Sequence, residues 1–199
     1  GGIFVSHSSA GIIDCEFSEN ISYRSGGMFM EYANVSVNDC VFSENIAQYS
    51  GGGIGMEYST PSVTRCSLYD NRVEAHGEGG GIYSYRSAPE IVNCIIWRNY
   101  AYDDGGGISL RSPPSSPLIT NSTIYANHAD SYGGGIWTNG TNSIVGNCVV
   151  WANTHGTSSV PSQLHGSFDV KFCDIQGGFS GPNIDANPLF TDPDNGDFH

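Results

Sequence analysis

The sequence predicts an all-β fold, a parallel β-solenoid with about 26 residues and three short strands in each rung. Two observations predict it: three kinds of residue recur in the same phase, and the apolar residues beside them stand two positions apart. The recurring positions are a glycine-led apolar residue (Ile3, Met28, Ile54, Ile82, Ile108, Ile136), a cysteine (Cys15, Cys40, Cys66, Cys94, Cys148, Cys173, with Ser122 in the fifth rung) and an asparagine (Asn20, Asn45, Asn71, Asn99, Asn127, Asn153). Each repeat must stack on its neighbours to bury its apolar face.

Residues 79–99, GGGIYSYRSAPEIVNCIIWRN, illustrate one rung in chain order. Paired glycines supply the backbone freedom that a tight corner needs, and the first strand begins at Ile82. Pro89 precedes the second strand, where no ladder donor is lost, and the third strand follows Cys94 and ends at Asn99. Alternate residues of each strand point inward. Six to seven such rungs, each adding about 4.8 Å, predict a rod on the order of 30 Å long.

The asparagine and cysteine rows have distinct expected roles. Stacked asparagines are expected to hydrogen-bond along the rod, and Asn tolerates the left-handed backbone that corners require. The cysteines occur once per rung at an inward position, which predicts a ladder of small buried thiols. Adjacent thiols would be near enough for a disulfide in principle. A metal site is not expected in this row, because its ligands would be spread along the rod.

Repeats are predicted over residues 1–156, and residues 157–199 are expected to form an irregular last rung and a C-terminal tail of the same domain.

The net charge of −13 argues against nucleic acid and anionic membranes as partners. The sequence contains no run of 18 apolar residues, so direct insertion into a membrane is not expected. The chain opens on Gly1 in mid-pattern, so a larger parent protein is expected. The uncapped first rung would also permit self-association.

The repeat GGGI…P.I.NC.I..N and the ending CDIQGGFSGPNIDANPLFTDPDNGDFH resemble bacterial secreted proteins with right-handed parallel β-helix repeats. The ending is similar to a segment found near the end of such helices in large, sorted, cell-surface proteins. The GG-I and F-S-E-N elements are similar to the repeats of polymorphic outer-membrane passenger domains. The resemblance, which includes pectate-lyase-like solenoids, implies a right-handed β-helix and an extracellular or bacterial cell-surface location. It does not imply one activity, since this fold carries lyases, hydrolases and adhesins.

An aromatic row provides the candidate ligand site. The position three residues after the cysteine marker is aromatic in four consecutive rungs: Tyr69, Trp97, Tyr125 and Trp151. An exposed line of aromatic rings about 4.8 Å apart would suit stacking on a glycan. The alternative is that a loop, the C-terminal tail or a neighbouring subunit covers this face.

Carboxylates provide the candidate catalytic and metal sites. Glu31 and Glu57 occupy the same position in successive rungs and should lie about 5 Å apart, which suits a retaining glycosidase, a cation site or a solvated acidic edge. Asp192, Asp194 and Asp197 alternate as calcium ligands do, but lack the full twelve-residue loop pattern. Calcium is therefore the one cofactor to test.

These patterns favour a non-catalytic extracellular β-solenoid, acting in surface adhesion, display or structural assembly, whose aromatic row contacts a glycan or a protein. The alternative is a carbohydrate-active enzyme of the β-helix type, either a polysaccharide lyase or a glycoside hydrolase. A groove that joins Glu31, Glu57 and an arginine would count against the non-catalytic interpretation.

Overall fold

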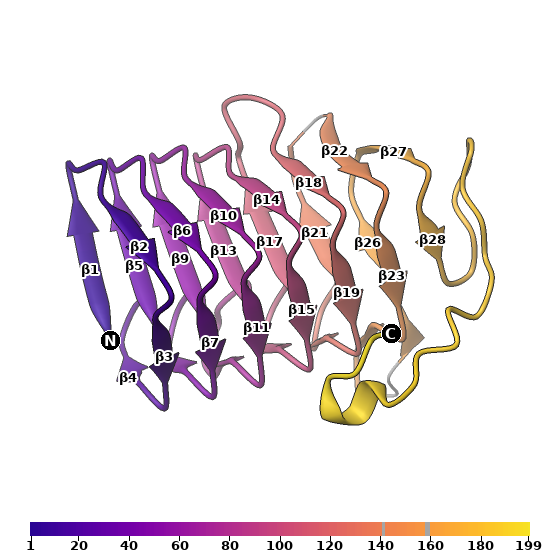
Figure 1. Ribbon diagram of the computed structural model, residues 1–199, viewed down its shortest axis with the longest axis horizontal. Helices are drawn as coiled ribbons and strands as arrows, with labels where there is room; N and C mark the ends of the chain where they lie inside the picture. Colours follow the sequence, from indigo (N-terminus) through magenta and orange to yellow (C-terminus); the bar gives the residue numbers. More distant parts are fainter. Residues whose placement is uncertain (141, 158–159) are drawn as a thin grey trace.

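The computed structural model describes residues 1–140, 142–157 and 160–199. It is a parallel β-solenoid in which successive rungs stack along one axis, from the N-terminal rung to the C-terminal tail (Figure 1). Ile82 pairs with Ile54 of the preceding rung and Ile108 of the following rung, so the glycine-led row lies in register. The predicted fold class and the repeat of about 26 residues are confirmed.

Four columns of strands form the walls, and each contains seven strands. Column A contains β1 (Ile3–Ser6), β5 (Met28–Glu31), β9 (Ile54–Glu57), β13 (Ile82–Tyr85), β17 (Ile108–Arg111), β21 (Ile136–Thr138) and β26 (Leu164–His165). Column B contains β2 (Gly11–Ile13), β6 (Ser36–Asn38), β10 (Ser62–Thr64), β14 (Glu90–Val92), β18 (Leu118–Thr120), β22 (Ser143–Gly146) and β27 (Phe168–Lys171).

The other two columns complete each rung. Column C contains β3 (Glu16–Ser18), β7 (Val41–Ser43), β11 (Ser67–Tyr69), β15 (Ile95–Trp97), β19 (Thr123–Tyr125), β23 (Val149–Trp151) and β28 (Asp174–Ile175). Column D contains β4 (Ile21–Ser22), β8 (Ile46–Ala47), β12 (Arg72–Val73), β16 (Tyr100–Ala101), β20 (His128–Ala129), β24 (Thr154–His155) and β25 (Val160–Pro161). All these pairings are parallel except that of β24 with β25.

The fourth column differs from the predicted three strands per rung. Its strands contain two residues each, and all except β25 begin directly after a row asparagine, as β12 does after Asn71. Two residues are too few to show the alternation that identifies a strand in a sequence. In the sequence, a small inward residue marks this column in each of four rungs. These residues, all fully buried, are Ala47, Val73, Ala101 and Ala129.

The core consists of the inward rows, as the sequence predicts. In the fourth rung, Ile82, Ile91 and Ile96 from columns A, B and C each have 0% exposed surface. Five of the six cysteines are buried and all six are free thiols, whereas Cys15 in the first rung is exposed. The Sγ atom of Cys66 donates to the backbone oxygens of Val37 and Thr64, which is the ordinary role of a small buried thiol.

The predicted asparagine ladder runs through the interior of the corner between columns C and D. Asn71 illustrates it: both its backbone N–H and its Nδ2 donate to Oδ1 of Asn99, and Nδ2 also donates to the backbone oxygen of Phe42. The same contacts repeat from rung to rung. At the C-terminal end Gln163 continues the ladder, since its Oε1 accepts from the backbone N and the Nδ2 of Asn153. Every rung is thereby tied to the next at a buried corner.

The left-handed backbone lies one residue earlier than predicted. At this corner the residue before each row asparagine has a positive φ, for example Asp70 at 53° and Arg98 at 52°. The row asparagines are not among the residues with positive φ. Their side chains therefore serve for hydrogen bonding inside the rod, and the residue before each of them takes the left-handed conformation.

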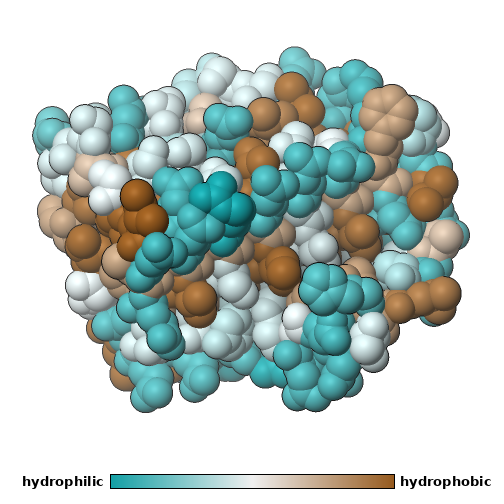
Figure 2. Space-filling model, in the orientation of Figure 1, coloured by the Kyte–Doolittle hydropathy of each residue, from teal (hydrophilic) through white to brown (hydrophobic). Residues whose placement is uncertain are grey.

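The two ends of the rod differ in surface. The first rung exposes apolar side chains, including those of Ile13 and Ile21. Figure 2 shows hydrophobic surface at the N-terminal end of the face in view. At the other end β27 and β28 continue columns B and C, and the chain then runs back along the rod to a short 3-10 turn at Pro193–Asn195 (Figure 1). The boundary expected at residue 156 adjoins residues 158 and 159, which lie outside the described residues. No helix in the described part of the chain is long and apolar enough to span the bilayer.

Candidate functional site in a groove on column A

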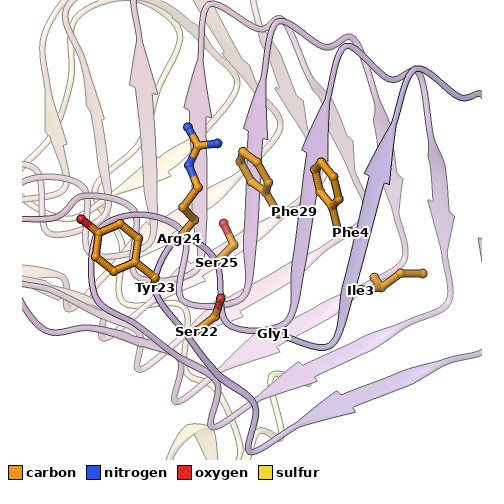
Figure 3. Close-up of a pocket in the computed structure, with 8 residues that line it drawn as sticks. All are labelled: Gly1, Ile3, Phe4, Ser22, Tyr23, Arg24, Ser25 and Phe29. Carbon is orange, nitrogen blue, oxygen red and sulfur yellow. The ribbon is translucent and has the colours of Figure 1, made fainter.

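The outer face of column A carries a groove. The segments that connect column D to column A fold back over this face and enclose a cavity of about 280 Å³. Its lining residues, here called the column-A groove, are Tyr23, Arg24, Tyr49, Ser50, Glu57, His76, Gly77, Glu78, Tyr83 and Arg111. An adjoining hollow of about 420 Å³ shares Tyr23 and Arg24 and contains the parallel rings of Phe4 and Phe29 (Figure 3). Aromatic rings and charged groups thus meet on one side of the rod.

The corner segment 74–78 delivers a carboxyl group into this groove. The glycine-led positions Ile54 and Ile82 are 28 residues apart, two more than the preceding interval, and the longer corner can reach over column A. Gly77 is required within it, because a Cβ atom there would lie 2.2 Å from the backbone oxygen of Tyr49. Glu78, the residue after Gly77, forms an isolated parallel bridge with Ser50, which fixes its backbone. The Glu78 side chain therefore points across the strands of column A.

Glu78 is a buried carboxylate with two partners. Ser109 Oγ donates to Glu78 Oε2 at 2.9 Å, and the guanidinium of Arg111 pairs with Oε1. Only 7% of the Glu78 surface is exposed, and this burial raises the pKa of its carboxyl group above the usual range. Arg111 and Ser109 oppose that rise in the pKa without cancelling it. Burial thus has a larger effect on the pKa of the Glu78 carboxyl group than its two partners have.

Replacing Glu78 with glutamine is expected to flatten the pH dependence of stability. The folded-state pKa of Glu78 exceeds its unfolded value of about 4.3, so the folded protein binds more protons and its stability falls as pH rises through the folded pKa. The Glu78→Gln variant lacks this loss. Urea unfolding at pH 4 and pH 7 should show a smaller decrease in the unfolding free energy for the variant than for the wild type. An equal decrease in both proteins would contradict the raised pKa.

The predicted neighbours Glu31 and Glu57 lie opposite each other on β5 and β9. Arg24 joins them: its Nη2 lies 2.8 Å from Glu57 Oε1, and its Nη1 lies 3.9 Å from Glu31 Oε1. The guanidinium also lies over the Phe29 ring, 4.6 Å from its centroid. Glu57 and Arg24 line the column-A groove, but Glu31 does not, so the groove joining Glu31, Glu57 and an arginine that would favour an enzyme is only partly formed.

Tyr83 lies between the two ion pairs. It projects outward from β13, where Gly55 and Ser109 are its neighbours in register on the adjacent strands. Burial raises the pKa of its phenol, and the charge of Glu78 raises it further. A neutral hydroxyl is therefore available to donate or accept a hydrogen bond in the groove.

The aromatic row also has the predicted alignment, but a second element covers it. Tyr69, Trp97, Tyr125 and Trp151 are neighbours in register on column C. The C-terminal tail folds over the middle of this row: the Phe198 ring lies 5.8 Å from that of Trp97 and 5.5 Å from that of Tyr125.

Contacts of the tail explain why Trp97 is only 7% exposed. Gly196 lies against the indole, so close that a Cβ atom there would be 3.1 Å from Trp97 Cζ2. Arg98, which pairs with Asp70, donates from Nη1 to the backbone oxygen of Asp194. The covered-face alternative of the sequence analysis therefore describes this structure, and a ligand could stack on Trp97 only after displacing the tail.

Replacing Trp97 with alanine is expected to release the tail while the rod stays folded. The substitution removes the ring beneath Phe198 and Gly196, and an aromatic contact contributes about 0.5–1.5 kcal/mol. A loss near the upper value raises the released population about tenfold. Limited proteolysis should therefore cut within residues 185–199 about tenfold faster. The control Trp137→Ala, which removes an indole from column A, should cut at the wild-type rate, and equal rates in all three proteins would contradict the contact.

The candidate calcium ligands lie in the tail but do not converge on one point. Asp192 and Asp197 bond to each other through backbone atoms. Asp192 Oδ2 accepts from Asn195 Nδ2, and Asp197 Oδ1 accepts from the His199 backbone. Across residues 1–140, 142–157 and 160–199, no three His, Cys, Asp or Glu side chains are placed to hold one metal ion. The calcium expectation has no geometric support among these residues.

Glu57 was predicted from the sequence, whereas Arg24, Glu78, Tyr83 and Arg111 were not. All four come from positions that alternate with core residues or lie in corners of variable length, where no row marks them. One signal was available for Glu78: the extra residues between Arg72 and Gly79 indicate a corner long enough to cover a neighbouring rung.

Comparison with known proteins adds a family. The family model described as "Periplasmic copper-binding protein (NosD)" matches residues 1–163. No curated protein matches the chain. A solved structure of QnrB1, a plasmid-mediated fluoroquinolone resistance protein, aligns with 89% of this chain and 73% of its own at 15% identity, but its TM-score of 0.20 carries no argument.

Proposed function

The chain belongs to the NosD family, and from that premise we propose that it is an extracytoplasmic β-solenoid that displays a saccharide-binding groove on column A. The family is described as periplasmic, which supports a location outside the cytoplasm. We further propose that the solenoid is displayed on a bacterial surface. The solenoid serves as a rigid support, because its rungs are joined by four parallel sheets and a buried asparagine ladder.

The composition of the groove supports a saccharide as the ligand. Sugars present apolar ring faces and many hydroxyls, so their sites combine aromatic rings with planar charged side chains. Tyr23 and Tyr49 provide exposed rings whose centroids are 4.7 Å apart. The Arg24–Glu57 and Arg111–Glu78 pairs provide donors and acceptors on the opposite wall. Because the net charge of the chain is −13, a neutral or weakly charged saccharide fits better than a strongly anionic one.

One observation carries the proposal: a single cavity contains both ion pairs and three tyrosines. Replacing Tyr49 with alanine is expected to weaken saccharide binding about two- to tenfold, since the loss of one stacking ring removes about 0.5–1.5 kcal/mol. Affinity gel electrophoresis against xylan, galactan, mannan and soluble cellulose derivatives measures this change. Tyr49 is 48% exposed, so the substitution should not affect folding.

A matched control separates the groove from a general surface effect. Tyr132 occupies the equivalent corner three rungs later and is 52% exposed, but does not line this cavity. The Tyr132→Ala variant should bind each polysaccharide as the wild type does. Equal weakening in both variants, or no binding to any saccharide on the panel, would overturn the proposal.

Glycoside hydrolysis is the second candidate, favoured by the presence of Glu57 and Glu78 in one cavity. A glycosidase needs one carboxyl group that keeps its proton and one that is ionised. The raised pKa of Glu78 suits the acid, and Glu57, bound to Arg24, suits the carboxylate. Release of reducing ends from the same polysaccharides should then disappear in both Glu57→Gln and Glu78→Gln. A wild-type protein that binds but releases no reducing ends would leave only the non-catalytic function.

Copper, named in the description of the family, finds no matching ligand set among the described residues. Copper sites in proteins use imidazole and sulfur ligands gathered at one point. His128 Nδ1 bonds to Thr154 and His155 Nδ1 bonds to the backbone oxygen of Ser131, while the thiols are spread along the rod at one per rung. No group of three His, Cys, Asp or Glu side chains forms in the described ranges. We therefore derive no step through copper.

A further inference from the structure

The last two cysteines of the ladder form a pair separated from the others. Ser122 occupies the ladder position between Cys94 and Cys148. Cys148 and Cys173 follow it in successive rungs, between the register pairs Val145–Val170 and Val149–Asp174. The backbone N–H of Cys148 lies 3.4 Å from Cys173 Sγ. The two residues are therefore direct neighbours along the axis of the rod.

This pair differs from the rest of the ladder in bordering a cavity at the end of the rod, although Cys148 and Cys173 are only 2% and 1% exposed. A cavity of about 380 Å³ opens beside it, lined by Asn147, Cys148, Val149, Phe172, Cys173, Asp174, Pro182 and Ile184. Ile184 is 60% exposed and belongs to the turn-rich segment after the last strand. Cys66 and Cys94, by contrast, lie in the middle of the rod between complete rungs. The terminal pair therefore borders a cavity that the pairs inside the rod do not border.

The hydrogen bond between the two thiols also shifts their pKa values in opposite directions. It lowers the pKa of Cys173 to about 7 and, with burial, raises the pKa of Cys148. The lowered pKa favours the thiolate of Cys173, and the thiolate is the form that attacks a disulfide.

We propose that Cys148 and Cys173 form a reversible disulfide that locks the terminal rung to the rung before it. In-register neighbours on adjacent strands have Cα atoms about 4.8 Å apart, within the range of about 4.4–6.8 Å that a disulfide spans. Outside the cytoplasm, thiols meet oxidising conditions, which supply the reason for such a pair to react. The lock would hold the segment that leads into the C-terminal tail.

The oxidant is a small-molecule disulfide, for which oxidised glutathione is the probe. The Cys173 thiolate attacks one sulfur of glutathione disulfide and displaces one glutathione thiolate, giving a mixed disulfide. Cys148 then loses its proton to solvent, attacks Cys173 Sγ and displaces the second glutathione. Two protein thiols are oxidised, and one glutathione disulfide is reduced to two thiols.

The experiment incubates the folded chain with oxidised glutathione at pH 7.5, followed by alkylation, mass spectrometry and peptide mapping. The wild type should lose two hydrogens through a cross-link between Cys148 and Cys173 and should melt at a higher temperature. The Cys148→Ser variant should instead keep one glutathione on Cys173, and Cys173→Ser should not acquire the cross-link. Serine is tolerated at this row, since Ser122 Oγ accepts from the Cys94 backbone and donates to Thr120.

The Cys66 and Cys94 pair is the matched control. These thiols are also hydrogen-bonded neighbours in the ladder and have the same 2% and 1% exposure as Cys148 and Cys173, but they do not line the terminal cavity. They should remain free in the folded wild type under the same conditions. A wild type that retains six free thiols, or one in which Cys66 and Cys94 cross-link as fast as the terminal pair, would overturn the proposal.

Discussion

Replacing Asn99 with alanine is expected to lower the unfolding free energy by about 3–5 kcal/mol. The side chain has four hydrogen bonds: its Oδ1 accepts from the backbone N and the Nδ2 of Asn71, and its Nδ2 donates to Leu68 O and Asn127 Oδ1. Alanine leaves the Asn71 backbone N–H and the Leu68 carbonyl without these partners in a fully buried corner. Each orphaned buried group costs about 1–3 kcal/mol. Urea unfolding followed by far-ultraviolet circular dichroism measures the loss.

The control for this prediction is Asn38→Ala, which removes an asparagine that is only half-buried at the end of β6. This surface substitution should change the unfolding free energy by about 0.5 kcal/mol or less. If Asn99→Ala were no more destabilising than Asn38→Ala, the ladder would not be the element that ties the rungs together.

Replacing Gly106 with alanine is expected to destabilise the rod by about 3 kcal/mol or more. A Cβ atom there would lie 2.4 Å from the backbone oxygen of His128 and 2.6 Å from that of Gly134. Both obstacles are backbone atoms of paired strands and corners, so relief requires the rungs to separate. Overpacking typically costs 1–3 kcal/mol where side chains can adjust, and more where they cannot. The glycine row is thus required for close packing between rungs.

Gly146→Ala is the matched control for this substitution. The nearest atom to a Cβ at Gly146 is Thr120 Cγ2 at 3.6 Å, an ordinary contact, and the residue does not have a positive φ. Thermal melts of the two variants should therefore differ widely, with Gly146→Ala close to the wild type. Similar melting temperatures for the two variants would show that the corner backbone can yield.

The fold could be predicted from the sequence because each rung of the solenoid repeats the same pattern of buried and outward positions. Residues that face the core in one rung, such as Ile91 and Ile96, face it in every rung, so each row can be read six times. The same reasoning predicted the stack of asparagines and the register of the aromatic row. The short strands of column D escaped detection because two residues carry no periodicity.

The candidate site could be predicted only in part, because it is the feature that does not repeat. Glu31 and Glu57 were placed side by side by their common position in two rungs. Glu78 reaches Arg111 across 33 residues from a corner of unusual length, and Arg24 reaches Glu57 across a similar separation. Such contacts depend on how corner segments fold over a neighbouring rung, which no row in the sequence records. The position of the tail on Trp97 was likewise one of several alternatives.

The location of saccharide binding tests the central claim most directly. Amide hydrogen exchange, measured by mass spectrometry with and without a saturating oligosaccharide from the polysaccharide that binds best, reports which segments the ligand protects. Protection is predicted in the corners around Arg24, Tyr49 and Glu78 and in β13, with β15, β19 and the C-terminal tail unchanged. Protection confined to column C and the tail, or no protection anywhere, would contradict a binding groove on column A.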